Sequence, residues 1–136
     1  MTHLLDTNAW IGYIRGKDAL LIQRLKAHHP SNLGLSTIAL SKLYYGAYHS
    51  GAANIAANIK LIETVLPVFP RVPFDEKSAE EFGRIREHLS SIGQLIGPYD
   101  MLLAAVARAN GLTLVTHNTA EFGRVPGLAI EDWQIP

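Results

Sequence analysis

Short apolar runs alternate along this chain with longer stretches in which apolar residues recur at helical spacing. The runs at 4–5, 33–35 and 112–115 are too short for helices and are typical of buried strands. Between them, apolar residues recur every three or four positions, which predicts amphipathic helices. Strands that alternate with helices form a mainly parallel sheet covered on both faces. The pattern therefore predicts an α/β fold, a three-layer α/β/α sandwich, with residues 1–136 as a single domain.

Capping and breaking residues set the expected limits of the helices. Pro70 within the strand-like run 68–72 indicates an edge or irregular strand, and 128–130 is a final apolar run. The expected helices are a first one that Asn8 caps, 19–27, one from Ser36 or Thr37 to about His49, 52–66, one that starts at Asp75, one from Pro98 to Asn110, and a short one at 120–122.

Composition narrows the classes of protein that this chain can represent. With 48% hydrophobic and 18% charged residues, 136 residues are enough for one globular core. The formal net charge is zero, so any contact with nucleic acid must come from a local patch. The absence of cysteine excludes disulfides and cysteine-bound metals, and it fits a reducing compartment such as the cytoplasm. We expect no signal peptide and no membrane span.

Three acidic residues stand where an α/β fold would bring them together. Asp6 follows the first strand, Asp100 is the third residue of the helix that Pro98 begins, and Glu121 follows the last clear strand. Ligands of such sheets bind at the carboxyl ends of the strands. Hard cations take oxygen ligands, so converging carboxylates indicate a site for Mg²⁺ or Mn²⁺. Taken singly, Asp6 could instead cap a helix, and Asp100 and Glu121 could simply favour the first turn of one.

Other common chemistries have no support in the sequence. The chain contains no G-x-S-x-G, no P-loop and no G-x-G-x-x-G motif. The six histidines show no metal-binding spacing. Asn8, two residues after Asp6, also argues against a dehalogenase-type phosphatase, which would have a second aspartate there.

Three segments together carry a family resemblance. They are LLDTNAWIGYI at 4–14, STIALSKLYYGAY at 36–48 and the stretch 96–133. In order and spacing they resemble the PIN-domain ribonucleases, and most of all the VapC toxins of bacterial toxin–antitoxin pairs. The resemblance covers essentially the whole chain, although the middle, 51–92, contributes little. It implies a metal-dependent endoribonuclease that uses Mg²⁺ or Mn²⁺, forms a homodimer and is neutralised by a cognate VapB-type antitoxin.

The resemblance also implies roles for individual residues. Asp6 and Asp100 match two core acids and would hold the metal. The other matching positions are polar: Asn118 stands where the family has Asp or Asn, Glu121 is a nearby acid, and Thr7, Asn8 and Thr116 flank the site.

Lys42 departs from the family at a position central to its chemistry. The family motif has the form S-x-[IV]-x-x-x-E-L-x-x-G, and its glutamate is Lys42 here, within STIALSKLYYG. Three interpretations are open: an active or once-active ribonuclease toxin, which Lys42 would impair, a PIN fold that only binds antitoxin or RNA, or a natural glutamate replaced in this chain. The intact remainder of the motifs favours the third over natural divergence. We expect the ammonium of Lys42 to pair with Asp6 or Asp100.

Two surface features bear on possible partners. RNA would be recognised in single-stranded or loop regions, where bases are accessible. Tyrosines on the helix that contains Lys42 are suited to hold an antitoxin peptide. The tyrosines are Tyr44, Tyr45 and Tyr48. The basic residues that could contact RNA phosphates, or could simply form solvated helix faces, are Arg15, Lys17, Arg24 and Lys26.

Overall fold

The computed structural model covers residues 1–136 and contains one five-stranded sheet in the order β3-β2-β1-β4-β5. Every neighbouring pair of strands is parallel. The predicted α/β class is therefore confirmed. The chain builds β2 and β3 on one side of β1, then crosses to add β4 and β5 on the other. The strands are β1 (His3–Leu5), β2 (Leu33–Ser36), β3 (Arg71–Val72), β4 (Thr113–Val115) and β5 (Ile130–Glu131).

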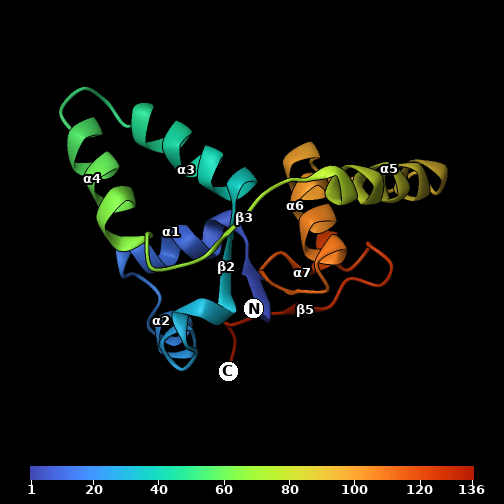
Figure 1. The fold of residues 1–136 in the computed structure, drawn as a ribbon, viewed down its shortest axis with the longest axis horizontal. Helices are drawn as coiled ribbons and strands as arrows, with labels where there is room; N and C mark the ends of the chain where they lie inside the picture. Colours follow the sequence, from blue (N-terminus) through green and yellow to red (C-terminus); the bar gives the residue numbers. More distant parts are fainter.

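Helices lie on both sides of this sheet (Figure 1). In that view α1 to α4 occupy one side, and α5 and α6 occupy the other. No helix is long and apolar enough to cross a membrane. The helices are α1 (Thr7–Arg15), α2 (Ala19–Lys26), α3 (Thr37–Tyr48), α4 (Ile55–Val65), α5 (Glu76–Ser91), α6 (Pro98–Ala109) and α7 (Thr119–Phe122), with a 3₁₀ turn at Pro30–Asn32.

Two expected elements are shorter in the structure. The strand expected at 68–72 is reduced to Arg71–Val72 at the sheet edge, as its proline suggested. Pro70 has no N–H to donate, but its carbonyl accepts a hydrogen bond from the Leu35 amide at 2.9 Å. The helix expected at 52–66 spans only Ile55–Val65, and the Asn54 side chain makes no capping hydrogen bond at its start.

The cap of α1 differs from the expected one. Asp6, not Asn8, is the N-cap, and its Oδ1 accepts a hydrogen bond from the Ala9 amide at 2.8 Å. Asn8 already lies inside the helix because Asp6 has extended backbone angles and the helix starts at Thr7. The expected caps Ser36 and Asp75 are confirmed, since each side chain accepts an amide from the first turn of α3 or α5.

The buried polar residues show where the fold departs from a purely apolar core. Only four polar or charged residues are buried: Asp6, Ser36, Ser78 and Thr116. Asp6, Ser36 and Thr116 lie at the carboxyl ends of β1, β2 and β4, three strands that are adjacent in the sheet. Burying a polar group is costly unless it is hydrogen-bonded, so a concentration of them at one edge marks a built site. The strand order reverses beside β1, which is where ligands bind in open α/β sheets.

Candidate active site

Asp6 is the most constrained side chain of the site. Its carboxylate is buried, and each of its oxygens has a fixed partner. Oδ1 accepts the Ala9 amide, and Oδ2 accepts the hydroxyl of Thr116 at 2.6 Å. The Asp6 amide donates to the carbonyl of Val115. The carboxyl ends of β1 and β4 are therefore joined by both a backbone and a side-chain hydrogen bond. Asp6 therefore caps α1 and is also fixed by Thr116 at the carboxyl ends of β1 and β4, where the candidate site was expected.

A hydrogen-bonded chain leads from Asp6 to Glu121. Thr116 Oγ1, which donates to Asp6, accepts the Asn118 amide at 3.0 Å. The Asn118 side-chain Nδ2 in turn donates to Glu121 Oε2 at 3.1 Å. The predicted residues Asp6, Asn118 and Glu121 are thus brought together, with Thr116 as the link.

Asp100 approaches the same point from α6. It lies in the first turn of that helix, partly exposed, and its carboxylate makes no hydrogen bond to another group of the chain. Burial raises the pKa of Asp100, the positive charge of Lys42 opposes that rise, and the negative charge of Glu121 adds to it. Burial also raises the pKa of Asp6 against the hydrogen bonds from Thr116 and Ala9, and the charge of Asp100 raises it further. Each carboxylate therefore lies within electrostatic reach of another, which supports their predicted convergence.

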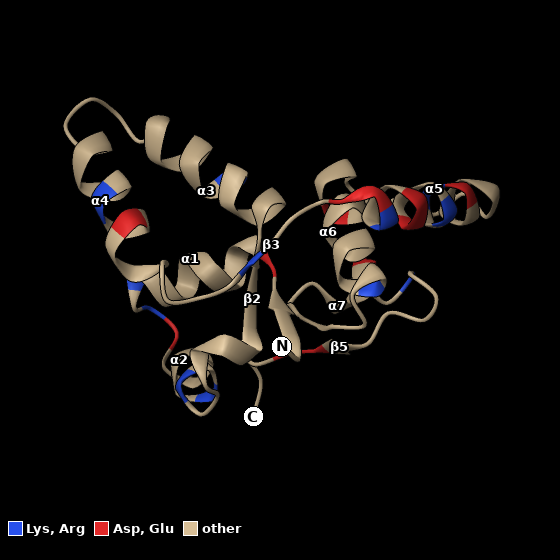
Figure 2. Ribbon diagram, in the orientation of Figure 1, with Lys and Arg blue, Asp and Glu red and all other residues tan.

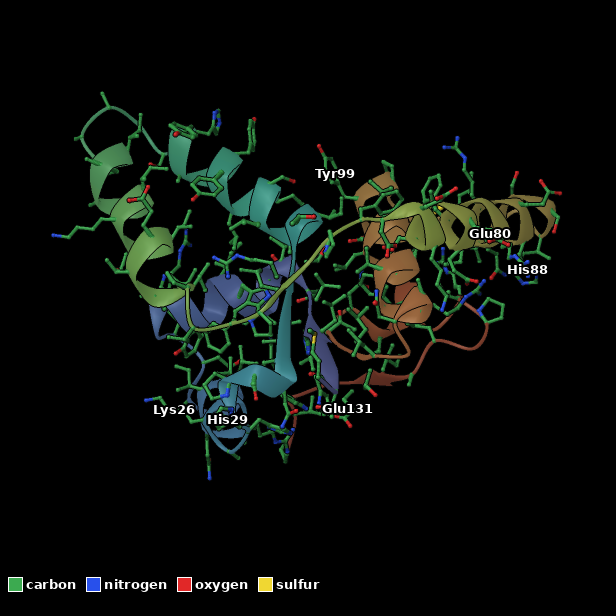
Figure 3. All side chains as sticks on the ribbon, viewed as in Figure 1. Lys26, His29, Glu80, His88, Tyr99 and Glu131 are labelled. Carbon is green, nitrogen blue, oxygen red and sulfur yellow. The ribbon has the colours of Figure 1, made fainter.

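Lys42 faces this carboxylate pair without touching it. The expected ion pair with Asp6 or Asp100 is wrong, because Lys42 has no carboxylate oxygen within 4.0 Å. Its Nζ lies instead 5.4 Å from the centre of the Tyr99 ring, a cation–π arrangement. Figure 3 shows Tyr99 projecting from the start of α6 toward α3. The ammonium acts on the acids through space only, and it lowers the pKa of both Asp6 and Asp100.

The donor atoms of the site can be tested against a divalent cation. No three His, Asp or Glu side chains are grouped so that they could hold a metal ion. Asp6 and Asp100 contribute two carboxylates, but both Asp6 oxygens already accept hydrogen bonds, and a cation, Lys42, faces them. Mg²⁺ and Mn²⁺ prefer several oxygen ligands and no positive charge among them. As the chain stands, its residues do not fit a tightly held divalent ion.

A groove that the sequence did not reveal adjoins the site at Lys42. It lies between α1, α3 and α4, and its charged lining residues are Arg15 and Lys42, with no acid. Lys42 is also the sole charged residue of α3, a helix that Figure 2 draws almost entirely in the tan of uncharged residues. The remaining lining residues are Ile11, Ile14, Leu43, Gly46, Ala47, Ser50, Asn58, Leu61 and Ile62.

Several expected contact residues lie apart from the groove and the carboxylates. Arg24 donates to the Asp132 carbonyl at 3.1 Å and so holds the C-terminal segment. Lys26, on the same helix, projects from the opposite end of the molecule to Tyr99 in Figure 3. Of the four basic residues considered for phosphate contact, Arg15 alone lines the groove. The sequence analysis missed Tyr99, and its place next to Asp100 is the one signal that could have drawn attention to it.

Comparisons with known proteins agree with this architecture. The family model described as "PIN domain" matches residues 3–128, and the chain belongs to that family. The tRNA(fMet)-specific endonuclease VapC of Salmonella typhimurium is 36% identical over 130 residues, 96% of each chain. Ribonuclease VapC2 of Haemophilus influenzae is 36% identical over 133 residues, 98% of each chain.

Solved structures extend the likeness to toxin–antitoxin complexes. In the DNA-bound VapBC of Salmonella typhimurium, a chain that is 33% identical superposes with a TM-score of 0.90, and 98% of each chain is covered. In VapBC2 of Rickettsia felis, bound to a DNA fragment from its promoter, a chain that is 30% identical gives a TM-score of 0.89, with 98% of this chain and 99% of that one covered. Within the PIN-domain family, this chain is thus similar to the VapC ribonucleases.

Proposed function

We propose that this chain is a VapC-type toxin, a metal-dependent endoribonuclease whose activity is impaired by Lys42 and which a VapB-type antitoxin neutralises. The observation that carries the proposal is the convergence of Asp6, Asp100, Asn118 and Glu121 at the strand-order reversal. Full-length similarity to proteins named as ribonucleases supports RNA as the substrate. Such an enzyme would act in the cytoplasm, where its RNA substrates are found.

The residues present explain why the acids that would hold a metal ion remain and why metal binding should nevertheless be weak. When bound, Mg²⁺ or Mn²⁺ would activate water and stabilise the charge on the scissile phosphate. Asp6 and Asp100 are the residues that would hold it. An ammonium about 5 Å from a divalent ion repels it by several kcal/mol even at an effective dielectric constant of about 20. Since ~1.4 kcal/mol corresponds to a tenfold change in affinity, Lys42 should weaken metal binding by orders of magnitude.

A second function is supported by Lys42 itself. A PIN fold without a working metal site could serve as a binding module for antitoxin or RNA. The fold does not depend on the missing glutamate, because Asp6 is held by Ala9 and Thr116 and not by residue 42.

The groove supports a position for the antitoxin. Its floor is apolar, and its charged groups are the cations Arg15 and Lys42. An amphipathic segment with an apolar face and an acidic side chain near Lys42 complements such a groove in shape and charge. We infer that the antitoxin lies there and reaches the carboxylate cleft at Lys42. We also propose a homodimer, the commonest symmetric assembly, which light scattering on the purified chain would detect.

A cleavage assay tests the enzymatic proposal. The native chain and Lys42→Glu are compared on the same RNA with Mg²⁺ or Mn²⁺, and Asp6→Asn is made in both backgrounds. We expect Lys42→Glu to cleave RNA at least a hundredfold faster than the native chain, and Asp6→Asn to abolish that gain. Equal cleavage by the native chain and Lys42→Glu, stopped in both by Asp6→Asn, would show that Lys42 is tolerated. Absence of cleavage in every form would favour the binding module.

A further inference from the structure

Lys42 and Tyr99 form a pair that neither the core nor the carboxylates require. Tyr99 is 52% exposed, and Lys42 is also exposed. The ammonium lies 5.4 Å from the ring centre and makes no ion pair. The pair joins α3 to the first turn of α6, directly beside Asp100. An exposed aromatic ring beneath a cation that makes no ion pair, beside the carboxylates, is more than packing needs.

We propose that Lys42 and Tyr99 bind one nucleotide of single-stranded RNA without any metal ion. The Tyr99 ring stacks on the base, and the Lys42 ammonium pairs with the adjoining phosphate. The inference rests on the function proposed above, since it supplies the contacts for that substrate. In this proposal Lys42 binds RNA phosphate, in addition to weakening the binding of a metal ion.

The chemistry of both partners suits a nucleotide. Single-stranded RNA exposes its bases, which stack on aromatic side chains with little dependence on sequence. Lysine is a compact point charge that pairs readily with phosphate. The separation of ring centre and ammonium is of the same order as that between a base and its own phosphate. Because the ammonium lies over one face of the ring, the base stacks there once the flexible Lys42 side chain swings from the ring onto the adjoining phosphate, so one nucleotide meets both groups.

The acids of the cleft determine on which side the phosphate lies. Asp6, Asp100 and Glu121 would repel a phosphate placed among them. On the other side of Lys42 the groove contains Arg15 as its second cation and no acid. The phosphate is expected on that groove side, between the two cations. The base then covers the exposed part of the Tyr99 ring, beside Asp100.

An RNA-binding assay without metal tests this site. The anisotropy of a short fluorescent single-stranded RNA is followed in EDTA, so that cleavage cannot interfere. We expect the native chain to bind and Tyr99→Ala to bind about tenfold more weakly, because stacking on one aromatic ring typically contributes that much. Tyr99→Phe keeps the ring and should bind like the native chain. Tyr45→Ala is the matched control for RNA binding. Tyr45 is also exposed, at 68%, but its ring stacks on the neighbouring His49 and not on Lys42.

The contribution of Lys42 has its own measurement. Lys42→Gln should weaken binding and reduce the slope of log K against log salt concentration by about 0.7, the value for one phosphate contact on a single strand. Lys42→Arg should retain that slope. An oligonucleotide with an abasic site at every position should lose the effect of Tyr99→Ala and keep that of Lys42→Gln.

Contrary outcomes are distinct from failure of the ribonuclease proposal. The site is refuted if the native chain does not bind RNA in EDTA, or if Tyr99→Ala and Tyr45→Ala weaken binding equally. It is also refuted if Tyr99→Ala weakens binding of the antitoxin and not of RNA, which would make the pair a protein contact. None of these results alters the expected gain of cleavage in Lys42→Glu, which tests the enzymatic proposal separately.

Discussion

The hydroxyl of Thr116 donates a 2.6 Å hydrogen bond to Oδ2 of Asp6, a residue 110 positions away in the chain. This bond joins the ends of β1 and β4 and leaves Asp6 with both oxygens engaged. The carboxylate is therefore held in place by the protein alone. A site with this support keeps its geometry when no cation is bound, at the cost of a buried charge.

Replacing Thr116 by valine should destabilise the fold. The change removes the donor from a buried carboxylate, a loss of about 1–3 kcal/mol in the free energy of unfolding. Denaturant unfolding of both proteins at pH 7 measures it. Thr113→Val is the matched control, because Thr113 begins β4, the strand that Thr116 directly follows, and its hydroxyl makes no hydrogen bond in the structure. Equal losses for the two variants would show that the bond to Asp6 contributes little.

Metal binding should appear when Lys42 becomes glutamate. The melting temperature of Lys42→Glu should rise with Mg²⁺ or Mn²⁺ concentration, because an ion that binds only the folded state stabilises it by mass action. At 100 times the dissociation constant the gain is about 2.7 kcal/mol. The native chain should show no such rise, and Lys42→Gln should fall between the two. A metal-dependent rise of equal size in the native chain would contradict the electrostatic account of Lys42.

Asp100→Asn should stabilise the protein at neutral pH. The folded-state pKa of Asp100 is raised above its ordinary value of 3.8, mainly by burial. Folding therefore opposes ionisation, and native stability is lost as pH rises through the folded-state pKa. We expect a gain of up to about 1 kcal/mol for the variant at pH 7, reduced by solvent screening because the group is partly exposed. The gain should vanish below about pH 3.8, where Asp100 is protonated in both states. A gain independent of pH in denaturation at several pH values would argue against charge as its cause.

A bulky side chain at Gly46 should block the antitoxin. Gly46 lines the groove, and a Cβ at this position meets nothing within 4 Å, so Gly46→Phe should fold normally. Gly83→Phe is the control, since Gly83 is also an exposed helical glycine with open space above it, but on α5. We expect Gly46→Phe to weaken binding of the co-expressed antitoxin more than tenfold in calorimetry and Gly83→Phe to leave it unchanged. Normal binding by Gly46→Phe would place the antitoxin elsewhere.

The sequence determined the fold class, and it singled out the acids of the candidate site. The strands followed from short apolar runs and the helices from apolar residues at helical spacing, and both are local features of the sequence. The caps Ser36 and Asp75 followed for the same reason, since capping involves neighbouring residues. Asp6 and Asn118 were placed at one site because parallel strands bring their carboxyl ends to one edge, a rule that needs topology but no coordinates. Asp100, at the start of a helix, was assigned from its match to the family motif.

Tertiary structure decided the features that depend on distance between remote side chains. The bond from Thr116 to Asp6 depends on how β1 and β4 align, and no local pattern encodes that alignment. The pairing of Lys42 with Tyr99, where the sequence suggested an ion pair with Asp6 or Asp100, depends on where α6 begins relative to α3. Opposite charges that the family motifs bring toward one site attract only as strongly as their separation and solvation allow. Packing of the helices fixes that separation, and it therefore decides what Lys42 contacts.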